Sequence, residues 1–320
     1  MISNWLQAHR VAQLVAIHAQ EELGVSREAY VDVFAAIRRA DIALMLEALP
    51  GHFGTYISPV GGGPGILVNS TLSLAAIRHT AAHELGHHQF EHGDSNDLQL
   101  DPWESQRPGA WTGPEMSAEA FAAWFLMPRP AVLGGLRLMG VDRPRSALDA
   151  YRLAQMLGVS YRGLCRHLAN LRLVTASTAQ DWAKVRRARL RQALAGPHAA
   201  TTTRDVHLLD ARMSGATVHV PTGDLLVTPA WAAEQHPAAA GAAASLEPVG
   251  TRETSHELPF SDQSDTKCWR VTGQTDAPIR LAADNPPSGA EEWSVTVRPV
   301  HVRQGIDLHW LERHQDRSHT

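Results

Sequence analysis

The amino-acid sequence predicts an α+β protein built in three consecutive parts, residues 1–135, 136–195 and 204–320. Short strand-like runs in the first part lead into a helix-compatible run that contains His83-Glu84-Leu85-Gly86-His87. The pattern of the second part predicts helices separated by a short glycine turn, and that of the third predicts short strands between turn signals. At 320 residues the chain is long enough for two or three domains, each with its own core.

Composition narrows the class of protein. The net charge of −4 gives no general indication of nucleic-acid binding. Lys184 and Lys267 are the only lysines, so arginine is the default cation and an arginine cluster is weak evidence for a binding site. The two cysteines, Cys165 and Cys268, fall in different predicted domains, which favours free thiols in a reducing cytoplasm. Neither a leader-like segment nor an apolar run of membrane-spanning length is found, so we expect no membrane association.

The first part is predicted to begin with two helices, over residues 5–22 and 29–39. The longer one carries apolar residues at helical spacing, namely Leu6, Val11, Leu14, Val15 and Ile17. Three short strands should follow at 41–47, 52–58 and 65–69, divided by proline- and glycine-rich turns. The strand at 52–58 is the candidate edge that holds an extended peptide by main-chain bonds, and an ordinary hairpin strand is the alternative.

The most informative run is His83-Glu84-Leu85-Gly86-His87, the HExxH pattern. Residues four apart lie on one face of a helix, so His83 and His87 can bind one metal ion together. Imidazole suits zinc, and Glu84 stands beside the coordination position left for water, where it can act as general base. Gly86 costs about 1 kcal/mol inside a helix, which indicates close packing there. Gly93 is placed where a C-terminal cap belongs.

A third metal ligand is required, and Glu115 is the best candidate. It lies just behind Pro114, which suits the first turn of a helix. Glu119 follows on the same face, so one carboxylate can bind the metal while the other accepts the second N–H of a ligating histidine. Two solvated surface glutamates are the alternative. Asp101 and Glu104 are weaker ligand candidates because they lie in a predicted loop.

These residues resemble a known family. The segment Arg78-His-Thr-Ala-Ala-His-Glu-Leu-Gly-His87 is similar to Arg-Phe-Thr-Leu-Ala-His-Glu-Leu-Gly-His of ImmA/IrrE-type metallopeptidases. Glu115-x-x-Ala-Glu-x-Phe-Ala122, followed by Leu126-Met-Pro128, resembles that family's Glu-x-x-Ala-Asn-x-Phe-Ala…Leu-Met-Pro signature. His79 and Glu119 depart from the pattern, where Phe and Asn or Asp are usual.

The resemblance covers the first half of the chain and implies a zincin-like domain with one Zn²⁺ per chain. It assigns the metal to His83, His87 and Glu115, with Glu84 as general base. Glu119 and His79 would then support the ligands from behind, although Glu119 could exchange roles with Glu115 and His79 could compete as a ligand. The resemblance also implies an endopeptidase that cleaves a helix-turn-helix transcriptional repressor, or works with one, in stress-response or mobile-element control.

Residues 93–114 show no periodicity, and a connection of that length is usually functional or disordered. Trp103 and Trp111 either make it a flap that faces substrate or fix it to the body of the domain.

The middle part predicts helices over 146–157 and 161–171, a helix-turn-helix-like pattern. The second helix has an apolar stripe formed by Leu164, Leu168 and Leu171. A DNA-binding interpretation would use Arg162, Arg166 and His167, and the basic run 184–191 could contact phosphates. We favour packing against the peptidase domain, with 184–191 as a solvated helix face, so DNA binding stays possible but is not favoured.

The sequence of the third part predicts a small β-rich domain, a sandwich of short strands. The strand candidates begin at Val206, Ala216, Asp224, Cys268, Pro278, Trp293 and Ile306. The Ala/Pro/Ser-rich stretch 234–266 is predicted to be a loop. Some relatives of the family carry a sensor-like domain of GAF type, but these strands do not establish that match. Substrate docking, signal sensing and self-association all remain open as its role.

The sequence therefore predicts a cytoplasmic zinc metallo-endopeptidase of ImmA/IrrE type. The alternative is a regulatory DNA- or protein-binding module that retains the zinc fold without proteolysis. A third hypothesis is that the protein is a phage-encoded or toxin–antitoxin interaction protein.

Overall fold

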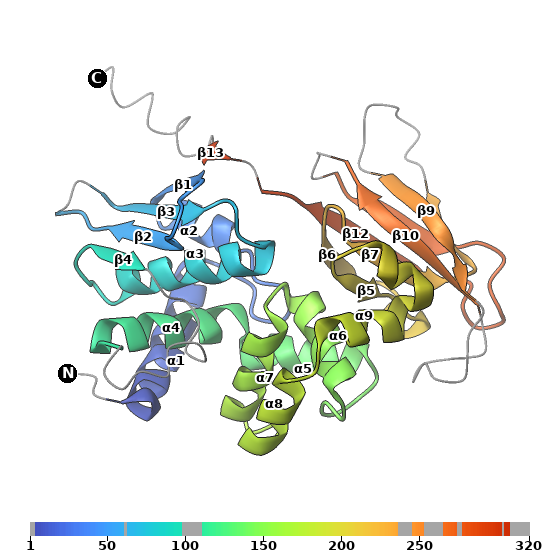
Figure 1. The fold of residues 1–320 in the computed structure, drawn as a ribbon, viewed down its shortest axis with the longest axis horizontal. Helices are drawn as coiled ribbons and strands as arrows, with labels where there is room; N and C mark the ends of the chain where they lie inside the picture. Colours follow the sequence, from blue (N-terminus) through green and yellow to red (C-terminus); the bar gives the residue numbers. More distant parts are fainter. Residues whose placement is uncertain are drawn as a thin grey trace. The chain divides into compact units, whose positions relative to one another are not determined.

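The computed structural model describes residues 4–60, 63–97, 111–235, 245–252, 265–273, 277–302 and 304–307. The chain divides into two compact units. The first comprises Met1–Ala131 with Val302–Thr320, and the second comprises Val132–His301. The mixed α+β architecture is as predicted (Figure 1), while the three-part division with boundaries near 135 and 204 stays a prediction.

The first unit contains a sheet with the strand order β13-β1-β3-β2-β4. Its strands are β1 (Ala43–Glu47), β2 (Gly54–Ile57), β3 (Gly65–Asn69), β4 (Ser95–Asp97) and β13 (Gly305–Ile306). β1 and β3 are parallel, whereas β2 runs antiparallel to both neighbours, β3 and β4. The three predicted strands are thus confirmed, and β4 and β13 extend the sheet on its two sides.

The helices of this unit are α1 (Trp5–Glu22), α2 (Val33–Arg39), α3 (Leu74–Gln89) and α4 (Gly113–Leu126). Each begins at a side-chain cap that accepts a hydrogen bond from the first turn: Asn4, Asp32, Ser73 and Thr112. The cap at Asp32 explains why α2 starts later than the predicted residue 29. Helix α3 ends at Gln89 with Glu91 in the left-handed conformation, so the prediction of a cap at Gly93 was wrong.

The buried face of α1 differs from the one that its large apolar residues suggest. Its buried positions include Ala8, Ala12 and Ala16, whereas Leu6 and Leu14 are 63% and 70% exposed. Alanine lets two helix backbones approach closely, and α1 packs on α4. The side-chain amide of Gln20 donates to the carbonyl of Phe125 at 2.8 Å and fixes this contact.

The second unit begins with helices α5 (Arg129–Leu138, whose first turn precedes the boundary), α6 (Ala147–Leu157), α7 (Tyr161–Asn170), α8 (Ala176–Ala183) and α9 (Arg187–Ala195). Helix α6 has a reciprocal capping box between Ser146 and Asp149. Gly158 closes it in the left-handed conformation, and Ser160 caps α7 two residues later. The two predicted helices and their short glycine turn therefore form where the sequence places them.

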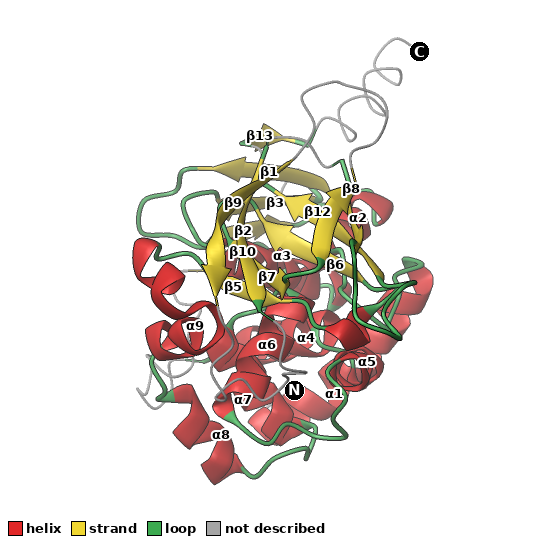
Figure 2. Cartoon of the chain, turned by 90° about the vertical axis from the view of Figure 1, so that its right-hand side faces the viewer, coloured by secondary structure: helices red, strands yellow, loops and turns green. Residues whose placement is uncertain are grey.

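The remaining strands of the second unit form two four-stranded sheets, ordered β5-β7-β10-β9 and β6-β12-β11-β8 (Figure 2). They are β5 (Val206–Leu208), β6 (Thr217–Pro221), β7 (Leu225–Pro229), β8 (Ala232–Gln235), β9 (Ser245–Arg252), β10 (Thr266–Thr272), β11 (Ile279–Ala283) and β12 (Ser294–Val300). One core, which includes Leu226 and Val271 from the first sheet and Val218, Leu281 and Val295 from the second, is shared by both sheets. This is the packing of a β-sandwich.

Two details of this region differ from the sequence-based prediction. The stretch 234–266, predicted as a loop, contains strand β9, which pairs with β10 along its length. The strand predicted from Ile306 lies largely outside the described residues, and its described part belongs to β13, which pairs with β1 of the first unit. Among the helices within the described residues, none combines the length and apolar composition needed to cross a membrane.

Candidate metal centre

Helix α3 places the HExxH residues in the interior of the first unit. His83, Glu84 and His87 are 0%, 0% and 1% exposed. The helix buries almost its entire central turn, because α4 packs on one side of it and strands β2 and β3 on the other. Polar side chains with so little exposure need hydrogen-bond partners, and the two imidazoles contact one on the neighbouring helix α4.

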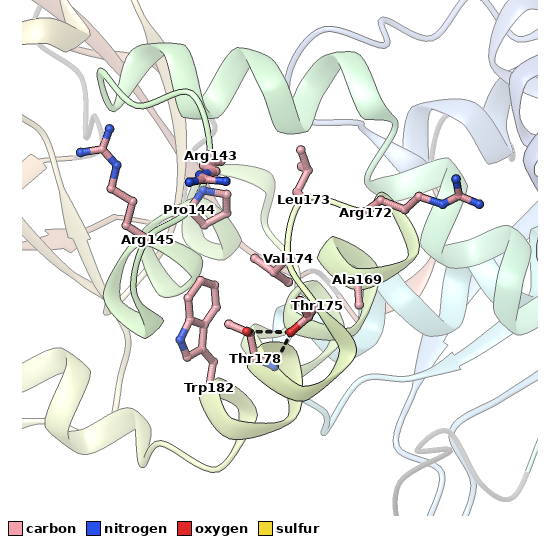
Figure 3. Close-up of a pocket in the computed structure, with 10 residues that line it drawn as sticks. All are labelled: Arg143, Pro144, Arg145, Ala169, Arg172, Leu173, Val174, Thr175, Thr178 and Trp182. Atoms are coloured by element: carbon pink, nitrogen blue, oxygen red, sulfur yellow. Dashed lines mark hydrogen bonds between the residues drawn. The ribbon is translucent and has the colours of Figure 1, made fainter.

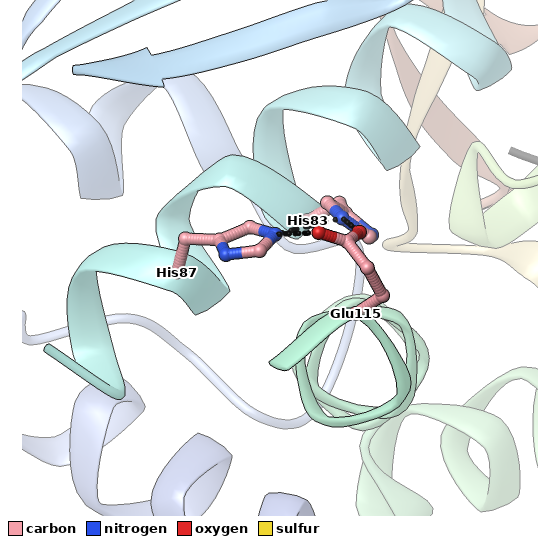
Figure 4. A group of neighbouring side chains, drawn as sticks. All are labelled: His83, His87 and Glu115. Atoms are coloured by element: carbon pink, nitrogen blue, oxygen red, sulfur yellow. Dashed lines mark hydrogen bonds and ion pairs between the residues drawn. The ribbon is translucent and has the colours of Figure 1, made fainter. Parts of the chain in front are cut away.

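The partner is Glu115, in the first turn of α4. Its Oε2 lies 3.2 Å from His83 Nε2, and its Oε1 lies 3.6 Å from His87 Nε2. The two Nε2 atoms are 3.1 Å apart. Donor atoms of the three residues all lie within 4.8 Å of one another, and Figure 4 shows them pointing to one place between the helices.

This donor set fits a tetrahedral zinc ion. With zinc–nitrogen and zinc–oxygen bonds of about 2.0–2.1 Å, tetrahedral ligand atoms stand roughly 3.3 Å apart, close to the separations found here. Two imidazole nitrogens and one carboxylate also form a ligand class of catalytic zinc sites, in which the fourth position is left for water or substrate.

The geometry depends on a close approach of α3 and α4. A Cβ atom on Gly86 would lie 3.1 Å from both Ala118 Cα and Phe121 Cδ1. Only glycine therefore fits without displacement at this crossing, as its position within the motif predicted. The crossing brings Glu115 opposite the histidines. The backbone N–H of Glu115 donates a hydrogen bond to the hydroxyl of Thr112, which caps α4.

Electrostatics favour an ionised Glu115. Partial burial alone would raise the pKa of this carboxyl group, but the hydrogen bonds from His83 and His87 outweigh burial and hold the pKa well below its ordinary value. An ionised carboxylate is the form that binds a metal.

Glu119 lies one turn further along α4, behind His83. Its Oε2 lies 3.6 Å from His83 Nδ1 and 2.8 Å from His79 Nε2, which donates a hydrogen bond to it because a carboxylate only accepts. Burial opposes the charge of Glu119, but the interaction with His79 outweighs it and lowers the pKa of the carboxyl group. The structure thus brings together both residues that depart from the family pattern, on the side of His83 that faces away from Glu115.

His87 has an equivalent neighbour that the sequence analysis missed. His92 Nδ1 lies 3.0 Å from His87 Nδ1, at the turn that follows α3. Burial, together with the nearby His87, lowers the pKa of His92 to about 4, so its ring is neutral near pH 7 and can accept the His87 N–H. Only the left-handed turn at Glu91 carries the chain back toward the site, and no pattern in the sequence predicted it.

Glu84 faces the sheet. Its Oε2 accepts a hydrogen bond of 2.8 Å from the Ser95 hydroxyl of β4, a residue that the sequence did not single out. The strand predicted at 52–58 does pass this carboxylate, but as β2 it is covered on its outer side by β4. Within the described residues it is therefore not the edge of the sheet, which corrects the prediction of an open edge.

Of the segment 93–114, the structure describes residues 93–97, where β4 forms although no periodicity was found, and residues from 111 onward. There the ring of Trp111 meets that of Trp5 edge to face, with centroids 5.3 Å apart, which fixes this end to α1. Trp103 and the weaker ligand candidates Asp101 and Glu104 lie outside the described residues.

The candidate DNA-contacting residues lie in the second unit, on α7. Arg162 is exposed, Arg166 is half-buried and His167 is 1% exposed. Leu164, Leu168 and Leu171 are buried, as their spacing predicted. Burial of His167 removes one of the three groups that a groove contact would use.

A shallow groove of 710 Å³ lies next to these helices, lined among others by Arg145, Arg172, Thr178 and Trp182. Figure 3 shows the side chains of Arg145 and Arg172 extending away from each other, so their charges do not converge on one ligand. The groove offers no arrangement comparable to that of the histidine–glutamate cluster.

Comparisons with known proteins agree with the position of this cluster. Residues 37–169 match the model of the Peptidase_M78 family, described as the IrrE N-terminal-like domain. None of the curated proteins matches the chain.

Two solved structures share a distant likeness. One is the cysteine protease inhibitor EhICP2 from Entamoeba histolytica, at 14% identity and a TM-score of 0.20, over 31% of this chain and 99% of that chain. The other is the solution structure of Amebosin, at 12% identity and a TM-score of 0.17, over 31% of this chain and 100% of that one. Such low scores carry no argument about activity.

Proposed function

Because residues 37–169 belong to the ImmA/IrrE-type peptidase family, we propose that this protein is a zinc-dependent endopeptidase. The observation that carries the proposal is the convergence of His83, His87 and Glu115 donor atoms next to the buried Glu84. These three residues would hold a zinc ion, which when bound would supply a Lewis acid for a peptide carbonyl and a water molecule with a pKa of about 7.

The residues of the chain have separate tasks in this reaction. His83, His87 and Glu115 hold the metal, and their own neighbours orient them: Glu119 stands behind His83, and His92 behind His87. Glu84 takes a proton from the attacking water and passes it to the leaving amine.

We further propose a protein substrate, a helix-turn-helix repressor, cleaved in the cytoplasm during stress or mobile-element control. Two features are compatible with a reducing compartment: Cys165 and Cys268 are free thiols, and both are buried. The resemblance to ImmA/IrrE-type metallopeptidases supplies the substrate class.

The test compares three forms of the full chain. Wild-type protein is expected to bind about one zinc per chain, His83→Ala to lose most of it, and Glu84→Gln to keep it, because Glu84 is a base and not a ligand. Metal content is measured by mass spectrometry. Cells that express wild type should contain new protein N-termini, absent with Glu84→Gln at equal zinc content.

Zinc loss from Glu84→Gln as complete as from His83→Ala would overturn the role of Glu84. Identical N-termini in wild type and Glu84→Gln would instead favour the alternative function, a regulatory module that retains the metal fold without proteolysis.

A further inference from the structure

Strand β4 occupies the outer side of β2, the strand that runs past the proposed general base. Backbone pairing is antiparallel, with Gly54 opposite Asp97 and Tyr56 opposite Ser95. Figure 1 shows β4 as the last strand on this side of the sheet, above α3. An extended peptide that binds by main-chain bonds to β2 would need the same row of N–H and C=O groups.

β2 is the right strand for such a peptide because it touches Glu84. A Cβ atom on Gly54 would lie 3.0 Å from Glu84 Oε1 and 2.5 Å from a methyl group of Thr80. The strand therefore passes over α3 with no side chain between its backbone and the base. A peptide paired with β2 would run beside the carboxylate that has to move its protons.

Ser95 connects the two strands to the base. Its hydroxyl oxygen accepts a hydrogen bond of 3.2 Å from the backbone N–H of Tyr56, on the outer side of β2. The same hydroxyl donates to Glu84 Oε2 at 2.8 Å. Ser95 thus engages the Tyr56 N–H, which a substrate backbone requires, and one Glu84 oxygen, which the attacking water requires.

Asp94, the residue before β4, holds the start of this strand through contacts with Ser58. Its Oδ1 accepts hydrogen bonds from the backbone N–H of Ser58 at 2.8 Å and from the Ser58 hydroxyl at 2.7 Å. These bonds lower the pKa of the Asp94 carboxyl group, so the contact persists at neutral pH. Asp94 is exposed, and its two bonds to Ser58 hold the start of β4 at the end of β2.

We propose that β2 is the substrate-binding strand and that β4 occupies the position of the substrate beside it. An extended peptide must displace β4 from β2 before Glu84 can act. The proposal rests on the peptidase function proposed above. Within the described residues, β4 pairs with β2 at three positions, from Ser95 to Asp97, and a peptide that pairs along the whole of β2 can replace these main-chain bonds. Displacement releases the Tyr56 N–H for the peptide and turns Glu84 Oε2 away from Ser95, toward the water. The site is therefore closed until substrate binds.

The first test changes the stability of the β2–β4 pair. The probe is a fluorescein-labelled hexa-alanine hydroxamate, an extended peptide whose hydroxamate binds zinc, and its affinity for the zinc-loaded full chain is measured by anisotropy. Asp94→Ala and Ser95→Ala should each bind the probe about fivefold more tightly, as expected for loss of one or two hydrogen bonds that hold β4. Asp181→Ala, which removes an exposed acid of the second unit, is the control.

A Ser95→Ala variant with weaker probe binding would overturn the proposal, because Ser95 would then be a permanent support for Glu84. Unchanged affinity in both Asp94→Ala and Ser95→Ala would also overturn it, since a peptide that adds to the outer side of β4 does not compete with that strand.

The second test locks the pair. Thr55 and Asn96 are directly opposite in the antiparallel register, which suits a disulfide between substituted cysteines. The oxidised Thr55→Cys/Asn96→Cys double variant should bind the probe about tenfold more weakly or worse, and reduction should restore the affinity. Arg280→Cys/Thr296→Cys, opposite positions on β11 and β12, is the matched control and should respond to neither treatment.

Equal probe affinity of the oxidised and reduced Thr55→Cys/Asn96→Cys protein would disprove displacement. Failure of the peptidase proposal looks different: the lock would still govern probe binding, while wild type and Glu84→Gln would produce the same N-termini in cells.

Discussion

At the scale of single residues, the two glutamates of α4 have distinct surroundings. Glu115 reaches both Nε2 atoms, whereas Glu119 lies behind the ring of His83. We therefore expect Glu115→Ala to abolish zinc binding and Glu119→Ala to weaken it about 10–100-fold, as the loss of a ligand's supporting partner does. Calorimetric titration with zinc measures both, with exposed Glu28→Ala as the control. The reverse ranking would make Glu119 the ligand.

The cysteines give a second prediction at this scale. Burial raises the pKa of the Cys165 and Cys268 thiols to about 11 each. Both should therefore resist iodoacetamide in the native protein at pH 8 and react after unfolding, as mass spectrometry can follow. Because the folded pKa lies above the unfolded value of about 8.5, their contribution to stability is complete below that pH. It should be lost as the pH rises toward 11.

At the scale of elements, the crossing of α3 and α4 controls the metal site. Gly86→Ala adds a methyl group where Ala118 Cα and Phe121 leave 3.1 Å. We expect it to destabilise the fold by about 1–3 kcal/mol, the usual effect of overpacking, and to weaken zinc binding because α4 carries Glu115. Gly93→Ala, which meets nothing within 4 Å, is the control. Denaturant unfolding and zinc titration check both effects, and an unchanged zinc affinity in Gly86→Ala would contradict the second.

Helix α7 gives a prediction about DNA. Its apolar stripe and His167 are buried, and only Arg162 is exposed among the three groups that a groove contact would use. We expect no sequence-specific binding to the protein's own promoter region in gel-shift titrations at low salt. Specific binding that disappears in both Arg162→Ala and Arg166→Ala and falls steeply with salt would overturn this expectation and support a regulator.

Helices and strands with a regular pattern were predictable from the sequence, and so was the proximity of His83, His87 and Glu115, whose role as metal ligands stays a prediction. The HExxH spacing and the start of α4 at Gly113, with Pro114 in its first turn, depend on local geometry, which a sequence encodes directly. Strand β9 was missed because its Ala/Pro/Ser-rich surroundings hide a run that pairing with β10 stabilises. The inward face of α1 was missed because close packing on α4 selects alanines over larger residues.

The neighbours of the site were harder to predict. His92 and Ser95 reach His87 and Glu84 only because a left-handed turn at Glu91 reverses the chain after α3. A non-glycine residue in that conformation has no reliable sequence signal. Long-range pairing, such as that of β13 with β1, is equally invisible to local patterns.

At the scale of the whole molecule, the two units should respond differently to metal. The candidate ligands lie in the first unit, and the sandwich of the second has its own core. At free zinc of about 1,000 times the dissociation constant, the metal should stabilise the unit that binds it by roughly 4 kcal/mol. Scanning calorimetry with and without a chelator should therefore shift one transition and leave the other in place. His87→Ala should not respond to the chelator, and a shift of both transitions would contradict the assignment.

The pairing of β13 with β1 has a consequence for the order in which the protein is made. The residues between Glu47 and Gly305 include the entire second unit, so the sheet beside the metal site receives its last strand only after the ribosome has produced that unit. At 5–20 residues per second, the interval between the two strands is roughly ten to fifty seconds. During that time the nascent chain carries β1 with one unpaired side, and synthesis itself sets the earliest moment at which the sheet is complete.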